Sequence, residues 1–138
     1  LLELNQQGYL NGHTPFSAYF AFMSVLAARI YGFDTVVVSN EQSANEGNLE
    51  WQGRTINHQY SKTYQFETLF RTYLETYFGQ QPVRPNYFSV LRPLNELQIA
   101  KAFSQFPAFW PVFRSCNIGQ KTDAWCYYCP KCLFFYNV

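Results

Sequence analysis

Four cysteines near the carboxyl end of the chain have the spacing of a metal site. Cys126, Cys129 and Cys132 form a C-x-x-C-x-x-C run, and Cys116 precedes them by a short polar loop. A structural zinc ion takes four such ligands at about 2.3 Å, and a C-x-x-C pair supplies two of them from one tight turn. We therefore predict a structural zinc-binding subregion over residues 114–132.

Two other uses of the cysteines stay open. Disulfides form with strain between cysteines this close in sequence, and nothing else in the chain indicates secretion. The C-x-x-C-x-x-C run also begins the ferredoxin pattern of an iron–sulfur cluster, but no further cysteine follows at the ferredoxin spacing. Gly119 is expected to supply the bend between Cys116 and the other ligands. Four protein ligands leave no position for water, so the predicted zinc is not catalytic.

A long polar stretch over residues 40–62 is the second candidate for chemistry. It carries carboxylates and amides and has no helical or strand period. Such a loop inside a compact domain is either functional or disordered. In the functional interpretation, Glu41 and Glu46 hold Mg²⁺ or carry a proton, and nucleotide phosphates are bound by Lys62 and by the amides of Asn40, Asn45 and Asn48.

Two helical patterns predict the elements that position this loop. Apolar residues recur at helical spacing over 16–31 and again over 64–78, and a glycine follows each stretch. Thr14 and Ser61 are the expected N-caps. Each helix therefore has one face that packs into a core.

Each helical pattern is followed by a short apolar run, over residues 34–39 and 86–91, that predicts a strand buried on both faces. Helix followed by strand, twice, predicts a parallel sheet, and ligands of such sheets gather beyond the carboxyl ends of the strands. Arg92 lies at such an end, where it is either a surface arginine or a contact for phosphate or carboxylate. We predict an α/β fold with a partial parallel sheet flanked by helices.

Composition limits the possible partners. The 138 residues are 48% hydrophobic and 20% aromatic, which predicts a single packed domain over residues 1–138. A net charge of +1 gives no broad field for binding nucleic acid. No apolar run approaches the roughly 20 residues of a membrane span, and reduced thiols favour the cytoplasm. The chain begins with Leu1 and ends within an apolar run, so we expect a fragment of a longer protein.

Several distinctive blocks of residues follow one another along nearly the whole chain. They are NGHTPFSA at 11–18, SNEQSANEGN at 39–48, NHQYSK at 57–62, LRPL at 91–94, and the four-cysteine tail. Together these blocks resemble the bacterial UDP-N-acetylmuramoyl-L-alanyl-L-glutamate epimerases, often called MurL. The resemblance implies ATP- and Mg²⁺-dependent inversion of the terminal L-Glu of UDP-MurNAc-L-Ala-L-Glu through an adenylated carboxylate. That reaction provides D-Glu for peptidoglycan, and hence for the cell wall and cell shape.

A more distant resemblance connects the sheet and the cysteine tail to the PP-loop ATP pyrophosphatases, which implies an adenine nucleotide alpha hydrolase-like fold. The Ser-Gly-Gly-x-Asp-Ser phosphate loop of those enzymes is absent from this sequence. We therefore expect the carboxyl-terminal part of such an enzyme, inactive by itself.

Residue chemistry assigns roles within this reaction. Glu41 and Glu46 are candidates for proton transfer or for Mg²⁺, and His13 and His58 for acid/base catalysis. Phosphate or glutamate carboxylate contacts are expected from Lys62, Arg92 and Arg114. Asn40, Asn45 and Asn48 either bind the nucleotide or substrate, or orient the backbone of their own loop.

Two other functions stay open. One is another PP-loop enzyme of the 7-cyano-7-deazaguanine synthase type, which acts on a base or a tRNA. The other is a non-enzymatic zinc module that binds a partner through exposed Trp125, Tyr127 and Tyr128.

Overall fold

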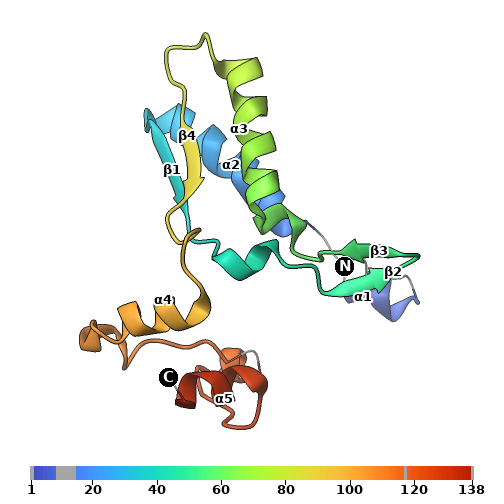
Figure 1. Cartoon of the computed structure of the whole chain (residues 1–138), viewed down its shortest axis with the longest axis vertical. Coiled ribbons are helices and arrows are strands. Elements are labelled where there is room, and N and C mark those ends of the chain that lie inside the picture. Colours follow the sequence, from blue (N-terminus) through green and yellow to red (C-terminus); the bar gives the residue numbers. More distant parts are fainter. Residues whose placement is uncertain (1, 9–14, 117, 138) are drawn as a thin grey trace. The chain divides into compact units, whose positions relative to one another are not determined.

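The computed structural model describes residues 2–8, 15–116 and 118–137. The chain divides into two compact units, unit 1 (Leu1–Pro93) and unit 2 (Leu94–Val138). Figure 1 shows the elements of both units. The single domain over 1–138 stays a prediction, and Thr14 and His13 lie outside the described residues.

Unit 1 is built on a parallel sheet of two strands. Strand β1 (Thr35–Val38) pairs with β4 (Asn86–Ser89), with Val36 opposite Tyr87 and Val37 opposite Phe88. The predicted parallel α/β arrangement is therefore confirmed for a sheet of two strands. The second strand ends at Ser89, two residues before its predicted end.

Helices α2 (Phe16–Tyr31) and α3 (Tyr64–Phe78) pack on one face of this sheet. Helix α2 ends, as predicted, at Gly32, whose φ of 75° favours glycine. The N-cap of α3 is Thr63 rather than the predicted Ser61, because the Thr63 hydroxyl accepts a hydrogen bond from the Phe66 N–H. The core is made of Ala21, Val25, Phe70, Leu74 and Tyr87.

The two faces of β1 differ, contrary to the prediction that both are buried. Val36 and Val38 pack against the core. Val37 points to the opposite face and is 53% exposed. The β-branched run therefore forms the predicted strand, but unit 1 buries only one side of it.

The polar stretch between β1 and α3 is more ordered than its sequence indicates. It contains short 3₁₀ helices at Gln42–Asn45 and Tyr60–Lys62, and a hairpin of β2 (Leu49–Trp51) and β3 (Arg54–Ile56). Both turn residues of the hairpin have positive φ, 48° at Gln52 and 71° at Gly53. Gln-Gly is not among the strong hairpin signals, and strands of three residues show no clear alternation.

Unit 1 also contains the short helix α1 (Leu2–Gln6), which precedes α2 in the sequence.

Unit 2 contains helices α4 (Glu96–Phe103) and α5 (Pro130–Asn137), with 3₁₀ turns at Pro107–Phe109 and Gly119–Thr122. Asn95 and Gln98 form a capping box that starts α4. The buried centre of the unit is made of cysteines, with Trp125 packed against them. Among the described residues, no helix is both long and apolar enough to cross a membrane.

Candidate functional site

The polar loop is attached to the carboxyl ends of both strands of the sheet. The Ser89 hydroxyl, at the end of β4, donates to the backbone carbonyl of Asn40 at 2.7 Å and lies 3.2 Å from that of Val38. Ser89 is buried, so these hydrogen bonds are shielded from water. The loop therefore starts where the sequence predicts a ligand site, and β4 helps to hold its first residues.

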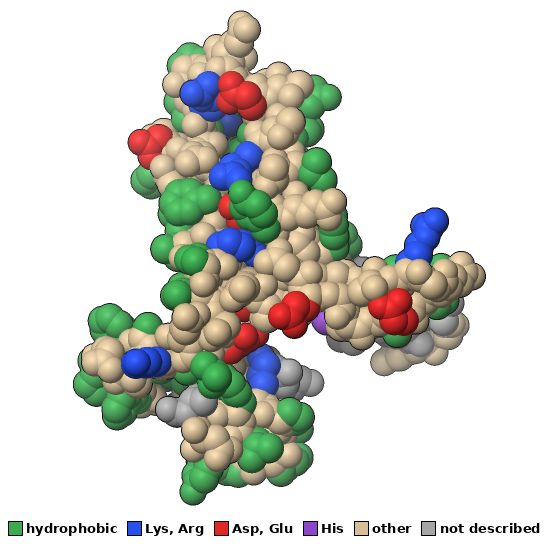
Figure 2. All heavy atoms as spheres, in the orientation of Figure 1, with side chains coloured by type: hydrophobic (Ala, Val, Ile, Leu, Met, Phe, Trp, Pro, Cys, Tyr) green, Lys and Arg blue, Asp and Glu red, His purple; other side chains and the backbone are tan. Residues whose placement is uncertain are grey.

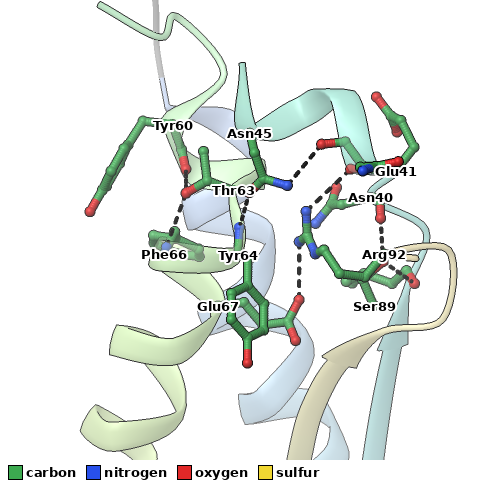
Figure 3. A network of polar contacts seen from close by, with 12 residues as sticks. Asn40, Glu41, Asn45, Tyr60, Thr63, Tyr64, Phe66, Glu67, Ser89 and Arg92 are labelled. Atoms are coloured by element: carbon green, nitrogen blue, oxygen red, sulfur yellow. Dashed lines mark hydrogen bonds and ion pairs between the residues drawn. The ribbon is translucent and has the colours of Figure 1, made fainter. Parts of the chain in front are cut away.

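A buried ion pair forms the second attachment, shown in Figure 3. Arg92 lies 3.0 Å from a carboxylate oxygen of Glu67, and their side chains are only 14% and 5% exposed. The same guanidinium donates to the backbone carbonyl of Glu41 at 3.3 Å. Arg92 thus connects the segment after β4 to α3 and to the loop after β1.

Sequence reasoning missed Glu67, although a signal was present. Glu67 lies three and seven residues before Phe70 and Leu74, which places a carboxylate on the buried face of α3. Carboxylates are almost never buried without a partner, so this position called for a cation elsewhere in the chain. The fold supplies it as Arg92.

Asparagines hold much of the loop's own backbone. The Asn45 side chain donates to the Gln42 carbonyl and accepts from the Tyr64 N–H at 2.7 Å, which ties the loop to the start of α3. The Asn48 side chain accepts from the His58 N–H. Asn45 and Asn48 therefore act, in this structure, in the backbone-orienting way that was one of their two predicted roles.

Most of the predicted catalytic and binding residues lie in the polar loop of unit 1. Glu41 is half-buried, whereas Glu46 and His58 are exposed. Lys62 donates to the Gln59 side chain at 2.8 Å. The predicted acid/base residue His13 lies outside the described residues.

Arg114 lies in unit 2 and is engaged there. Its guanidinium donates to the backbone carbonyls of Pro111, Phe113 and Asp123 and lies 3.6 Å from the Asp123 carboxylate. These contacts connect residues 111–114 to Asp123, on the other side of Cys116 in the sequence. Like Lys62 and Arg92, the cation of Arg114 is therefore held by protein partners in this structure.

The four cysteines converge in unit 2, as the sequence predicts. Their sulfurs all lie within 4.8 Å of one another, and three of the separations are 3.5, 3.7 and 3.9 Å. Sulfurs placed tetrahedrally around zinc at about 2.3 Å are about 3.8 Å apart. A disulfide would need about 2.05 Å, and all four cysteines are free. The group can therefore hold a metal ion such as zinc.

The surroundings of the cysteine sulfurs favour the thiolate at Cys116 and disfavour it at Cys132. Burial opposes ionisation of Cys116, but hydrogen bonds from the N–H groups of Gly119 and Cys126 outweigh it and lower the pKa of Cys116 to about 6. Burial, with the neighbouring Cys129 sulfur, raises the pKa of Cys132 to about 11. Four thiolates this close would need a cation between them, and a divalent metal ion such as zinc would supply it.

Gly119 matters through close packing in addition to the predicted bend. Its N–H donates to the Cys116 sulfur at 3.1 Å, and a Cβ at this position would collide with the backbone carbonyl of Ala124. We expect Gly119→Ala to destabilise unit 2 by about 1–3 kcal/mol through this overlap. Zinc affinity, measured by competition with a coloured chelator, should fall, whereas Gly53→Ala in the unit 1 hairpin should leave it unchanged. Equal zinc affinity for both variants would contradict this explanation.

Comparison with known proteins places the chain in a family. Three relatives are each described as UDP-N-acetyl-alpha-D-muramoyl-L-alanyl-L-glutamate epimerase. They come from Salinispora tropica, with 42% identity over 140 residues, from a Micromonospora species, with 41% over 140, and from Xanthomonas oryzae pv. oryzae, with 39% over 142. Each alignment covers 99% of this chain but only 30%, 31% and 31% of the relative. No solved structure matches the chain significantly.

The family match also corrects one prediction. The family model for the MurL N-terminal domain matches residues 1–90, so the expectation of a carboxyl-terminal part is wrong. That expectation came from the missing Ser-Gly-Gly-x-Asp-Ser loop, which placed this chain after a phosphate-binding segment by analogy with a more distant family. With the model covering well over half of the 138 residues and three relatives aligned along almost the whole chain, this protein belongs to the MurL epimerase family and carries its N-terminal domain.

Proposed function

We propose that this chain is part of an ATP- and Mg²⁺-dependent isomerase that converts the terminal L-Glu of UDP-MurNAc-L-Ala-L-Glu to D-Glu for peptidoglycan synthesis. The observation that carries the proposal is the 39–42% identity to three epimerases along 99% of the chain. The chain spans about a third of those relatives' length, so the activity is proposed for the whole polypeptide. We also propose a cytoplasmic location, an adenine nucleotide alpha hydrolase-like fold, and no nucleic-acid or membrane partner.

The proposed reaction requires acid/base groups at the α-carbon of the substrate glutamate. The α-proton next to a carboxylate is barely acidic, because its removal would add a second negative charge to the same group. ATP, when bound, supplies the adenylyl group that removes this obstacle. The protein must then take the proton from one face of the α-carbon and return one to the other, which needs one or two positioned acid/base groups.

We assign this proton transfer to the loop after β1. Glu41 and Glu46 are the proposed carriers, or ligands of Mg²⁺, with His58 and His13 as further acid/base candidates. The attachment of Asn40 to Ser89, and of the Glu41 backbone to Arg92, supports the proposal, because a carrier must be held in place to meet the α-carbon. Asn40, Asn45, Asn48, Lys62, Arg92 and Arg114 remain the proposed binding residues. We also propose that the cysteine cluster binds zinc in a structural role.

Proton exchange at the glutamyl α-carbon tests the proposal. The full-length enzyme carrying this chain should incorporate deuterium from D₂O into UDP-MurNAc-L-Ala-L-Glu only when ATP and Mg²⁺ are present. We expect Glu41→Gln or Glu46→Gln to reduce incorporation by about 10²–10⁴-fold, the usual contribution of a general acid or base. Nuclear magnetic resonance of the substrate α-proton measures the exchange.

Glu75→Gln is the matched control, because Glu75 is an exposed carboxylate that pairs only with Arg84 among its described contacts. It should exchange like the unchanged enzyme. An unchanged rate in both loop variants would remove Glu41 and Glu46 from the mechanism. No exchange by the intact, zinc-loaded enzyme would favour one of the other functions, the base-modifying PP-loop enzyme or the zinc interaction module.

A further inference from the structure

The parallel sheet of unit 1 is incomplete as it stands. Parallel sheets occur almost only with both faces covered, and most sheets have four to six strands. Among the described residues this sheet has only β1 and β4, and the two helices that pack on it share one face. On the opposite face, Val37 is 53% exposed and its cross-strand neighbour Phe88 is half-buried. Within the part of the chain that the structure describes, the sheet therefore presents an apolar face and an outer edge of β1 that pairs with no strand.

The outer edge of β1 carries backbone groups ready for another strand. The carbonyls of Asp34 and Val38 accept hydrogen bonds from β4, from the N–H groups of Asn86 and Val90 at 2.8 and 3.1 Å. Backbone groups of successive residues in a strand point to opposite edges. The N–H and C=O groups of Thr35 and Val37 therefore point away from β4.

An open groove lies between β1 and the start of α2. It has a volume of about 410 Å³ and is lined by residues 36–40, by Tyr87 of β4 and by the first turns of α2. The rings of Phe16 and Phe20 stand on its α2 side, 62% and 54% exposed, with their centroids 4.9 Å apart. Apolar side chains from an added strand would find partners both in this groove and on Val37. Figure 2 shows how widely hydrophobic side chains come to the surface of the protein.

We propose that the outer edge of β1 and the adjoining α2 groove bind a β-strand supplied by the part of the epimerase that lies beyond these residues. The length of the relatives supports this occupant, because the matched segment is only 30–31% of each of them. Backbone pairing with an exposed sheet edge, with side chains entering flanking pockets, is a common way for an extended segment to bind. The proposal rests on the family membership and not on the proposed reaction.

Residue-resolved hydrogen exchange tests the proposal within one strand. In the full-length epimerase carrying this chain, the amides of Thr35 and Val37 should exchange at least about tenfold more slowly than in the isolated chain of residues 1–138. The amides of Val36 and Val38, which point toward β4, should be protected in both proteins and serve as the internal control. Equal rates for Thr35 and Val37 in the two proteins would overturn the proposal.

Light scattering on the isolated chain tests a second explanation, in which a second copy of the chain occupies the edge of β1. If the isolated chain already protects Thr35 and Val37, a second copy or another segment of the same chain occupies the edge, and the proposal is wrong. In the full-length protein, Val37→Asp should bring the Thr35 amide back to its rate in the isolated chain. Val112→Asp, at an exposed valine of unit 2, should leave that rate unchanged. Slow exchange at Thr35 in the Val37→Asp protein would count against the proposed contact.

Discussion

Replacing Arg92 with methionine is expected to lower the free energy of unfolding of unit 1 by about 3–5 kcal/mol. The substitution leaves the Glu67 carboxylate, 5% exposed, without its partner at 3.0 Å. A buried carboxylate without a partner has lost its hydration, and no ion pair compensates for that loss. Urea denaturation followed by circular dichroism measures the change.

Two comparisons distinguish the effect of breaking a buried ion pair from the effect of removing a charge at the surface. Arg84→Met breaks the Arg84–Glu75 pair, whose side chains are 54% and 67% exposed, and should cost only about 0–1 kcal/mol. Combining Arg92→Met with Glu67→Leu should recover much of the lost stability, because no isolated charge remains buried. Similar losses for Arg92→Met and Arg84→Met would show that the Arg92 pair is hydrated in solution.

The same substitution should release the start of the polar loop. Arg92 donates to the Glu41 carbonyl, and the neighbouring attachment of Asn40 to Ser89 remains in the variant. We therefore expect faster amide exchange over residues 40–46 in Arg92→Met, beyond the change that global destabilisation explains. Arg92→Lys should show part of this effect, because a lysine ammonium lacks the planar fork that reaches two partners at once.

Removing the proposed zinc ion from the cysteine cluster is expected to unfold unit 2, while unit 1 keeps its structure. The buried centre of unit 2 consists of Cys116, Cys129 and Cys132, with Trp125 and Cys126 packed against them. Structural zinc contributes about 10–16 kcal/mol of apparent binding free energy in small zinc domains, far more than this small core supplies otherwise. Unit 1 has a separate core of aliphatic and aromatic side chains.

Metal analysis and chelation make this prediction quantitative. The purified chain should contain one zinc ion, and EDTA should make the amides of α5 exchange freely while those of α3 stay protected. Acidification should also release the metal, because protons compete for the thiolates as the pH falls. Cys116→Ser should reproduce the effect of EDTA, whereas Ser115→Ala should bind zinc normally. A brown, iron-containing protein would instead indicate an iron–sulfur cluster, and protected α5 amides in EDTA would contradict a structural role for the metal.

The sequence by itself determined the features that depend on neighbouring residues. Helices α2 and α3 follow from apolar residues at helical spacing and from the glycines at their ends. The cysteine cluster follows from ligand type and from the short C-x-x-C spacing, which brings at least three sulfurs together in almost any compact fold. The family was also evident from short blocks of residues, although the position within the family was not.

Only the tertiary structure decided which polar groups meet. Glu67 and Arg92 are 25 residues apart, and neither shows in the sequence which partner it has. Asn45 and Asn48 looked equally suited to a ligand and to a loop, and the fold turned them toward Tyr64 and His58. Hydrogen-bonding side chains accept many partners, so their use is settled by the packing of distant segments. In the same way, the β-branched run of β1 showed that it would form a strand, but the number of helices and strands packed around it determined which of its faces is covered.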